Sequence, residues 1–153
     1  MTTSSQQLPP AAALMQLLFG YAVSRAVGVA AELRIADLVA DAPKTATELA
    51  VQIGVHPQSL YRLLRACASA GVFAEDAGQR FGLTPLADCL RNTNPQSLRA
   101  FAEMLTNETQ FQMWADLSYS VKTGQRAFDL FHRFPGINQP VGAVVVVRNR
   151  LIV

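Results

Sequence analysis

The sequence has little charge, and that shortage excludes two classes of protein. Only 16% of its 153 residues are charged and 50% are apolar, whereas a disordered chain has the opposite balance. Its 13 basic residues against 11 acidic ones leave an excess too small to indicate a nucleic-acid-binding surface by itself. The length corresponds to one ordinary domain, or to a small domain with additional helices.

Cysteine and histidine are equally scarce, and they are not spaced as ligands. Cys67 and Cys89 form no CxxC motif, and neither His56 nor His132 has a second histidine four residues away. We therefore expect no metal site and no disulfide framework. Both cysteines are predicted to pack in the core, and the expected location is reducing and cytoplasmic.

Glycine motifs that bind phosphate groups are missing too. The nine glycines never form GxG, so the sequence contains neither a dinucleotide-binding fingerprint nor a P-loop. Four carboxylates of the second half are better explained as solvated helix faces than as acid–base pairs: Glu103, Glu108, Asp116 and Asp129. The sequence thus predicts no catalytic residue and no cofactor-binding residue in this chain.

What the sequence does have is a long apolar segment near its beginning. Residues 1–10 are polar and predict a disordered lead-in, whereas residues 11–39 show helical spacing of apolar residues and predict a helix in two pieces. Arg25 is the only charge between Ala11 and Ala31. The abundance of alanine and glycine argues against a membrane span, and the lack of a basic start argues against a secretory signal.

This segment predicts self-association. A helix that is apolar on nearly every side must be covered on nearly every side, and a chain this short has few ways to do so alone. Gly20, Ser24 and Gly28 also lie four residues apart, which lets another backbone approach closely. We predict a homodimer; the alternative is a central helix inside a monomer.

Residues 45–90 predict a winged helix. Thr45 or Thr47 can cap a short helix that Gly54 ends, and Pro57 begins a second helix that ends by Gly71. Residues 72–74 and 80–83 are short apolar runs that predict a β-hairpin, and Thr84 with Pro85 begins a further helix. The predicted fold class is mainly α, with one small hairpin and additional dimerisation helices.

The third quarter of the chain predicts two more helices. Leu98 to Leu105 forms one, and a second carries Phe111 and Trp114 on a single face and ends at Gly124, with a break between them near residues 106–109. Phe111, Met113, Trp114 and Tyr119 could line a pocket for a flat aromatic ligand. Plain core packing explains this cluster equally well.

A winged helix also raises the possibility of a DNA-binding regulator. The outward positions of the helix that begins at Pro57 are polar: Gln58, Ser59, Arg62, Arg65 and Ser69. The arginines could reach phosphates or guanine. Glu75 and Asp76 in the wing would instead repel phosphate, so we prefer to interpret the arginines as solvated groups and keep DNA binding as the alternative.

These residues together resemble a known family. The order of an apolar helix, a winged helix (LYRLLR at 60–65, GLT at 82–84) and the stretch MWADLSYSVKTG at 113–124, followed by Ala127-Phe128-Asp129, is similar to the N-terminal domain of S-adenosylmethionine-dependent O-methyltransferases. The relevant branch includes plant caffeic-acid-type enzymes and bacterial polyketide and carotenoid enzymes. The resemblance covers residues 11–134.

The resemblance implies a dimer formed by intertwined helices, with a wing that supports the dimer and the acceptor pocket instead of binding DNA. It places Phe111, Met113, Trp114 and Tyr119 near the pocket for a small aromatic, polyketide or carotenoid-type acceptor, and Met15 near the partner's pocket. In the full-length enzymes the methyl donor is S-adenosylmethionine. The expected partners are a second copy and, with a catalytic domain, the acceptor; neither nucleic acid nor membrane is expected.

The chain also departs from the family. The Rossmann-like catalytic domain, its glycine-rich cofactor loop and its histidine base would follow residue 134, where this sequence has an apolar tail with four consecutive valines at 144–147. We expect residues 135–153 to be an atypical tail, from truncation or a frameshift, and the chain to be inactive alone. A remnant that folds poorly is the third alternative.

Overall fold

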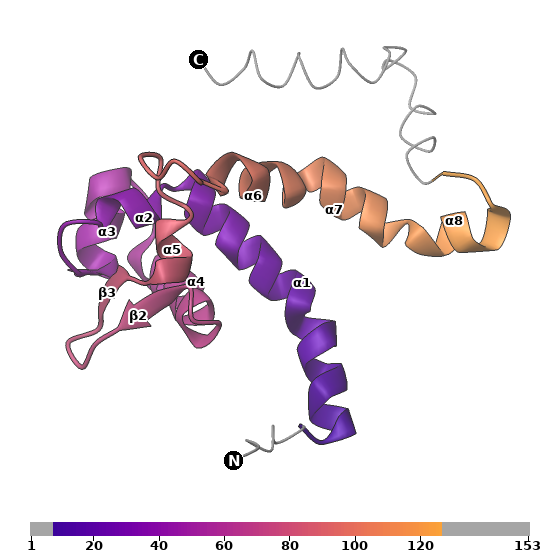
Figure 1. Ribbon diagram of the computed structural model, residues 1–153, viewed down its shortest axis with the longest axis horizontal. Coiled ribbons are helices and arrows are strands. Elements are labelled where there is room, and N and C mark those ends of the chain that lie inside the picture. Colours follow the sequence, from indigo (N-terminus) through magenta and orange to yellow (C-terminus); the bar gives the residue numbers. More distant parts are fainter. Residues whose placement is uncertain (1–7, 127–153) are drawn as a thin grey trace, which may run out of the picture. The chain divides into compact units, whose positions relative to one another are not determined.

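The computed structural model describes residues 8–126 (Figure 1). Contacts within the chain divide it into two compact units, residues 1–107 and 108–153. The predictions made for residues 1–7, for His132, for Asp129 and for the tail at 135–153 lie outside the described residues. The prediction of a domain at 11–134 and a separate tail stays a prediction.

The apolar segment folds as two helices, as predicted. α1 (Pro10–Glu32) begins with proline at its first position, where the missing N–H costs nothing, and α2 (Ile35–Leu38) follows. Arg34 separates them because it adopts a left-handed conformation with φ of 54°, which an α-helix cannot contain.

Local signals set the bounds of the next two helices. α3 (Ala46–Ile53) begins with a capping box: the Thr45 hydroxyl accepts from the Glu48 amide at 3.2 Å, and the Glu48 carboxylate accepts from the Thr45 amide at 2.7 Å. These bonds to Thr45 lower the pKa of Glu48. Gly54 ends the helix at φ of 71°, and α4 (Pro57–Ser69) begins at Pro57. Of the two caps considered, the protein uses Thr45.

The predicted hairpin is present, and a third strand joins it. β2 (Phe73–Glu75) and β3 (Arg80–Leu83) are antiparallel, and β1 (Lys44–Thr45) pairs with the other edge of β3, so the strand order is β1-β3-β2. β1 was not predicted, because a two-residue strand has no alternation of apolar and polar residues. Glycine at position 82 of β3 lets Pro43, the residue before β1, lie close to the sheet, since a Cβ at Gly82 would lie 3.3 Å from the Pro43 ring.

One core holds α1, the helices of the winged helix and the sheet together. Its largest fully buried side chains come from five elements and from the residue that follows α2: Ile35, Val39, Leu49, Leu64, Cys67, Phe73 and Phe81. Tyr61 packs edge-on against Phe81, with ring centroids 5.8 Å apart. The buried residues of α4 are Leu60, Leu64 and Cys67, none of which is among the positions predicted to face outward, and Leu63 packs partly against the same core.

The chain then returns to α1. Thr84 caps α5 (Pro85–Asp88), as predicted, and a loop in which Asn94 makes local hydrogen bonds leads to α6 (Arg99–Leu105). α6 packs on α1 within the first unit.

The second unit departs from its prediction. Instead of one helix over residues 111–124, it contains α7 (Glu108–Ala115) and α8 (Leu117–Thr123), separated at Asp116. Asp116 has φ and ψ of −91° and 10°, a turn conformation rather than a helical one, and its carboxylate accepts from Gln112 at 3.2 Å. Gly124 ends α8 in a left-handed conformation, as predicted.

Candidate dimerisation surface

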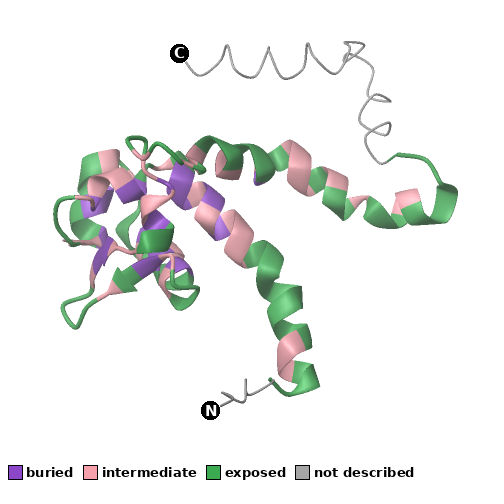
Figure 2. Cartoon of the chain, viewed as in Figure 1, coloured by how far each residue is buried: buried purple, intermediate pink, exposed green. Residues whose placement is uncertain are grey.

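The first half of α1 presents an apolar face to solvent (Figure 2). Leu14, Leu17, Leu18 and Tyr21 recur at intervals of three and four residues and are 58% to 79% exposed. We call these four residues the α1 apolar stripe. By length and apolar composition, α1 is also a helix that could cross a membrane.

The second half of the same helix is covered by the chain itself. Its buried positions are small: Ala26, Gly28, Ala30 and Ala31. They allow α4 and α6 to pack closely against the helix. The small residues that lie four apart therefore have different surroundings: Gly28 is buried within the chain, whereas a Cβ at Gly20 would meet nothing within 4 Å among the described residues.

α6 adds a second exposed apolar surface to this unit. Leu98, Phe101, Met104 and Leu105 are all more than two-fifths exposed, while Ala102 packs against the core. Soluble monomers rarely expose many large apolar side chains together, and such surfaces mark sites of association.

The predicted pocket residues are distributed over both units. Met15 lies exposed on α1, whereas Phe111, Met113 and Trp114 lie on α7 and Tyr119 on α8. Trp114 is 65% exposed, and the Tyr119 hydroxyl donates to Gln125 at 2.6 Å. Phe111 and Met113 are half-buried. Their role in an acceptor pocket stays a prediction.

Two side chains of α4 form hydrogen bonds with the wing. Arg65 donates to Glu75 at 2.8 Å, and the Tyr61 hydroxyl donates to the same carboxylate at 3.0 Å. Hydrogen bonding to Glu75 raises the pKa of Arg65 and that of Tyr61. Arg62 remains exposed and donates to Ser59 at 3.4 Å. One of the two arginines of the DNA-binding alternative is thus paired with an acid.

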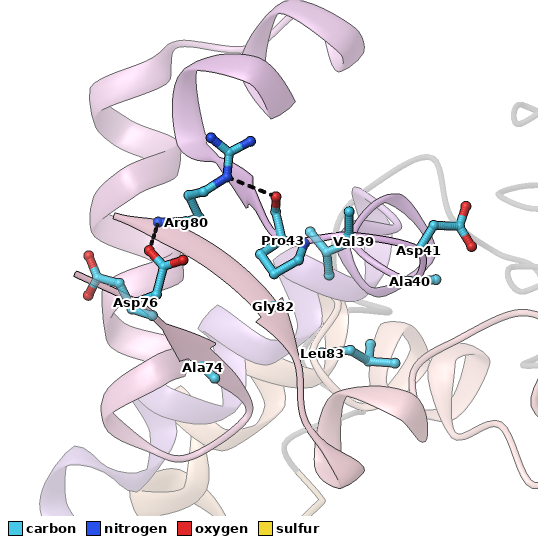
Figure 3. Close-up of a pocket in the computed structure, with 11 residues that line it drawn as sticks. Val39, Ala40, Asp41, Pro43, Ala74, Asp76, Arg80, Gly82 and Leu83 are labelled. Carbon is cyan, nitrogen blue, oxygen red and sulfur yellow. Dashed lines mark hydrogen bonds between the residues drawn. The ribbon is translucent and has the colours of Figure 1, made fainter. Parts of the chain in front are cut away.

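A hollow of about 400 Å³ lies between the loop at 39–43 and the sheet (Figure 3). Arg80 donates to the Pro43 carbonyl at 3.1 Å and to Glu48 at 3.0 Å, while Asp76 accepts from the Arg80 amide at 2.9 Å. The guanidinium of Arg80 and one carboxylate oxygen of Asp76 are thus already bound within the chain, where they stabilise the loop, α3 and the wing.

The cysteines differ in their surroundings. Burial raises the pKa of the Cys67 thiol to about 11, which keeps it protonated and unreactive, as a core residue should be. Cys89 is only half-buried, so its predicted place in the core is only partly correct. Within residues 8–126, no three His, Cys, Asp or Glu side chains gather closely enough to hold a metal ion.

Comparison with known proteins shows which family the chain belongs to. Residues 15–93 match the family model of the O-methyltransferase dimerisation domain. Phenazine O-methyltransferase PhzM of Lysobacter antibioticus is 46% identical over 122 residues, which are 80% of this chain and 36% of that protein. The chain thus spans about a third of the length of the curated relatives it matches.

Solved structures agree with this match. That of LaPhzM aligns with a TM-score of 0.81 and 40% identity over 94% of this chain and 41% of its own. The O-methyltransferase NcsB1 from neocarzinostatin biosynthesis, in complex with S-adenosylmethionine and 2-hydroxy-5-methyl naphthoic acid, aligns with a TM-score of 0.61 and 35% identity over 70% of this chain and 33% of its own. With its apolar helix, its winged helix and these matches, the chain belongs to the O-methyltransferase family through its dimerisation domain.

Proposed function

We propose that this chain pairs with a second copy of itself through the α1 apolar stripe and serves as the dimerisation part of an O-methyltransferase. The observation that carries the proposal is the exposure of Leu14, Leu17, Leu18 and Tyr21 on a helix whose other half is buried. Each such side chain covered by a partner contributes about 1.5–3 kcal/mol. The match to a dimerisation domain supports the same surface.

In a complete enzyme, S-adenosylmethionine would donate a methyl group to a hydroxyl of a small, flat acceptor. We propose that Phe111, Met113, Trp114 and Tyr119 wall its pocket and that Met15 reaches the partner's pocket. Aromatic and thioether side chains suit that task because they offer large, adaptable apolar contact areas. The chain contains no GxG loop, so we expect the isolated 153 residues to transfer no methyl group from labelled S-adenosylmethionine. The cytoplasmic location stays a proposal.

Light scattering coupled to size-exclusion chromatography tests the dimer. The wild-type chain should have twice the mass of one copy, and Leu17→Glu should have the mass of one copy, because a buried carboxylate without a partner opposes association. Val51→Glu is the matched control: Val51 is exposed on α3, outside the stripe, and its variant should remain a dimer.

Each other result would contradict the proposal in its own way. A wild-type chain of single mass at high concentration would exclude the dimer. If Leu17→Glu and Val51→Glu both dissociate, an added charge disrupts the dimer wherever it lies, and the α1 apolar stripe is not shown to be the interface. Sedimentation of the wild type with lipid vesicles, lost in Leu17→Glu, would assign α1 to a membrane instead.

A further inference from the structure

α1 and α6 meet at one unusually close contact. A Cβ on Gly28 would overlap the Thr106 hydroxyl and would lie 2.6 Å from Thr106 Cβ, closer than packed carbon atoms come. Thr106 follows the last residue of α6 and is only 2% exposed. The threonine side chain therefore occupies the space that any residue other than glycine would fill at position 28.

The polar groups of this contact are satisfied. The Thr106 hydroxyl donates to the Ala102 carbonyl at 2.8 Å, and the Thr106 carbonyl accepts from Arg25 at 2.9 Å. Arg25 also pairs with Glu32 at 2.7 Å, so its guanidinium links two turns of α1 to the C-terminal end of α6. A cation placed there satisfies an otherwise orphaned helix carbonyl and suits the helix dipole.

The contact explains two features of α1 that composition alone leaves unexplained. Glycine inside a helix costs stability relative to alanine, yet α1 has glycine at 28, where only glycine admits Thr106. Arg25 is the single charge between Ala11 and Ala31, and it binds the Thr106 carbonyl. Both features therefore serve the attachment of α6.

We infer that Gly28, Thr106 and Arg25 form a joint that fixes α6 on α1 and so combines the exposed apolar residues of the two helices into one surface for the second copy. Both sets of exposed side chains belong to the first unit, and at the joint α1 directly contacts the residue that follows α6. The part of this inference that concerns the second copy rests on the proposed dimer. The joint itself does not.

A double-mutant cycle with the full chain tests the joint. Gly28→Ala forces Thr106 out, and Thr106→Gly removes the three atoms that the new Cβ would meet first. We expect α6 amides to exchange hydrogen at least about tenfold faster in Gly28→Ala, and the dimer to dissociate about tenfold more readily. In the Thr106→Gly background, Gly28→Ala should cause neither effect.

Gly20→Ala is the matched control for adding a methyl group to α1. Among residues 8–126, its Cβ would meet nothing within 4 Å, so α6 exchange should not change. If Gly28→Ala leaves α6 protected, or if its effects persist in the Thr106→Gly background, the joint is wrong.

The two readouts separate the inference from the proposed function. If Gly28→Ala loosens α6 while the dimer keeps its affinity, the joint exists but does not shape the dimer surface. A monomeric wild-type chain would overturn the proposed dimer and the surface built on it, while α6 exchange would still decide whether the joint exists.

Discussion

The winged helix and the first half of α1 are both rich in large apolar side chains, but only the winged helix covers its own. Leu64 is fully buried on α4, which packs against α3, α1 and the sheet, whereas Leu17 of α1 is 79% exposed. Burial depends on whether the chain folds back over a residue, and not on the residue's own hydrophobicity. One region therefore forms a core, and the other leaves its apolar side chains exposed to solvent.

The largest expected difference between the two regions is the loss of stability when a buried leucine is shortened. Leu64→Ala should lower the free energy of unfolding by about 2–5 kcal/mol, since it removes packed atoms and leaves a cavity. Val51→Ala, at an 81% exposed position of the neighbouring helix, is the control and should change it by less than about 0.5 kcal/mol. Chemical denaturation at one fixed protein concentration measures both. Equal losses would mean that the winged helix has no core of its own.

Thiol labelling tests how well that core excludes solvent. In a Cys89→Ser variant, Cys67 should react with a disulfide reagent at pH 8 about a hundredfold more slowly than an unhindered thiol, because burial raises its pKa to about 11 and leaves little thiolate. The rate should become ordinary in denaturant. Rapid labelling of the folded variant would show that the core opens readily.

A smaller effect tests the local signal that begins α3. Thr45→Ala should cost about 1 kcal/mol, because it removes the hydroxyl that caps the Glu48 amide. Thr47→Ala, the other cap considered from the sequence, lies exposed within the helix and should be nearly neutral. Thermal unfolding compares them. A larger loss for Thr47→Ala would reverse the assignment of the cap.

The parts of the fold that could be predicted are those with short-range signals. Gly54, Pro57, Thr84 and Gly124 each act on the few residues beside them, and each begins or ends a helix as expected. Asp116 was harder, because aspartate is tolerated in a helix and becomes a break only when its side chain finds a local partner such as Gln112. β1 was missed for a related reason: a two-residue strand is defined by its neighbour, not by its own pattern.

The candidate surface was predictable in kind but not in extent. An all-round apolar helix indicated a need for a partner, yet nothing in the pattern separated its exposed half from its covered half. The exposure of α6 could not be predicted, because the helical spacing of Phe101 and Leu105 is the same in a face that packs on a core and in a face that packs on a partner.

Caps, glycines, prolines and apolar spacing act over one or two turns, so they predict the order of the first helices, the wing and the need to cover α1. Which half of α1 the chain covers, and why Gly28 and Arg25 are there, depends instead on contacts between distant residues. Arg25 and Thr106 are 81 residues apart, and a contact over that separation exists only after α6 has returned to α1.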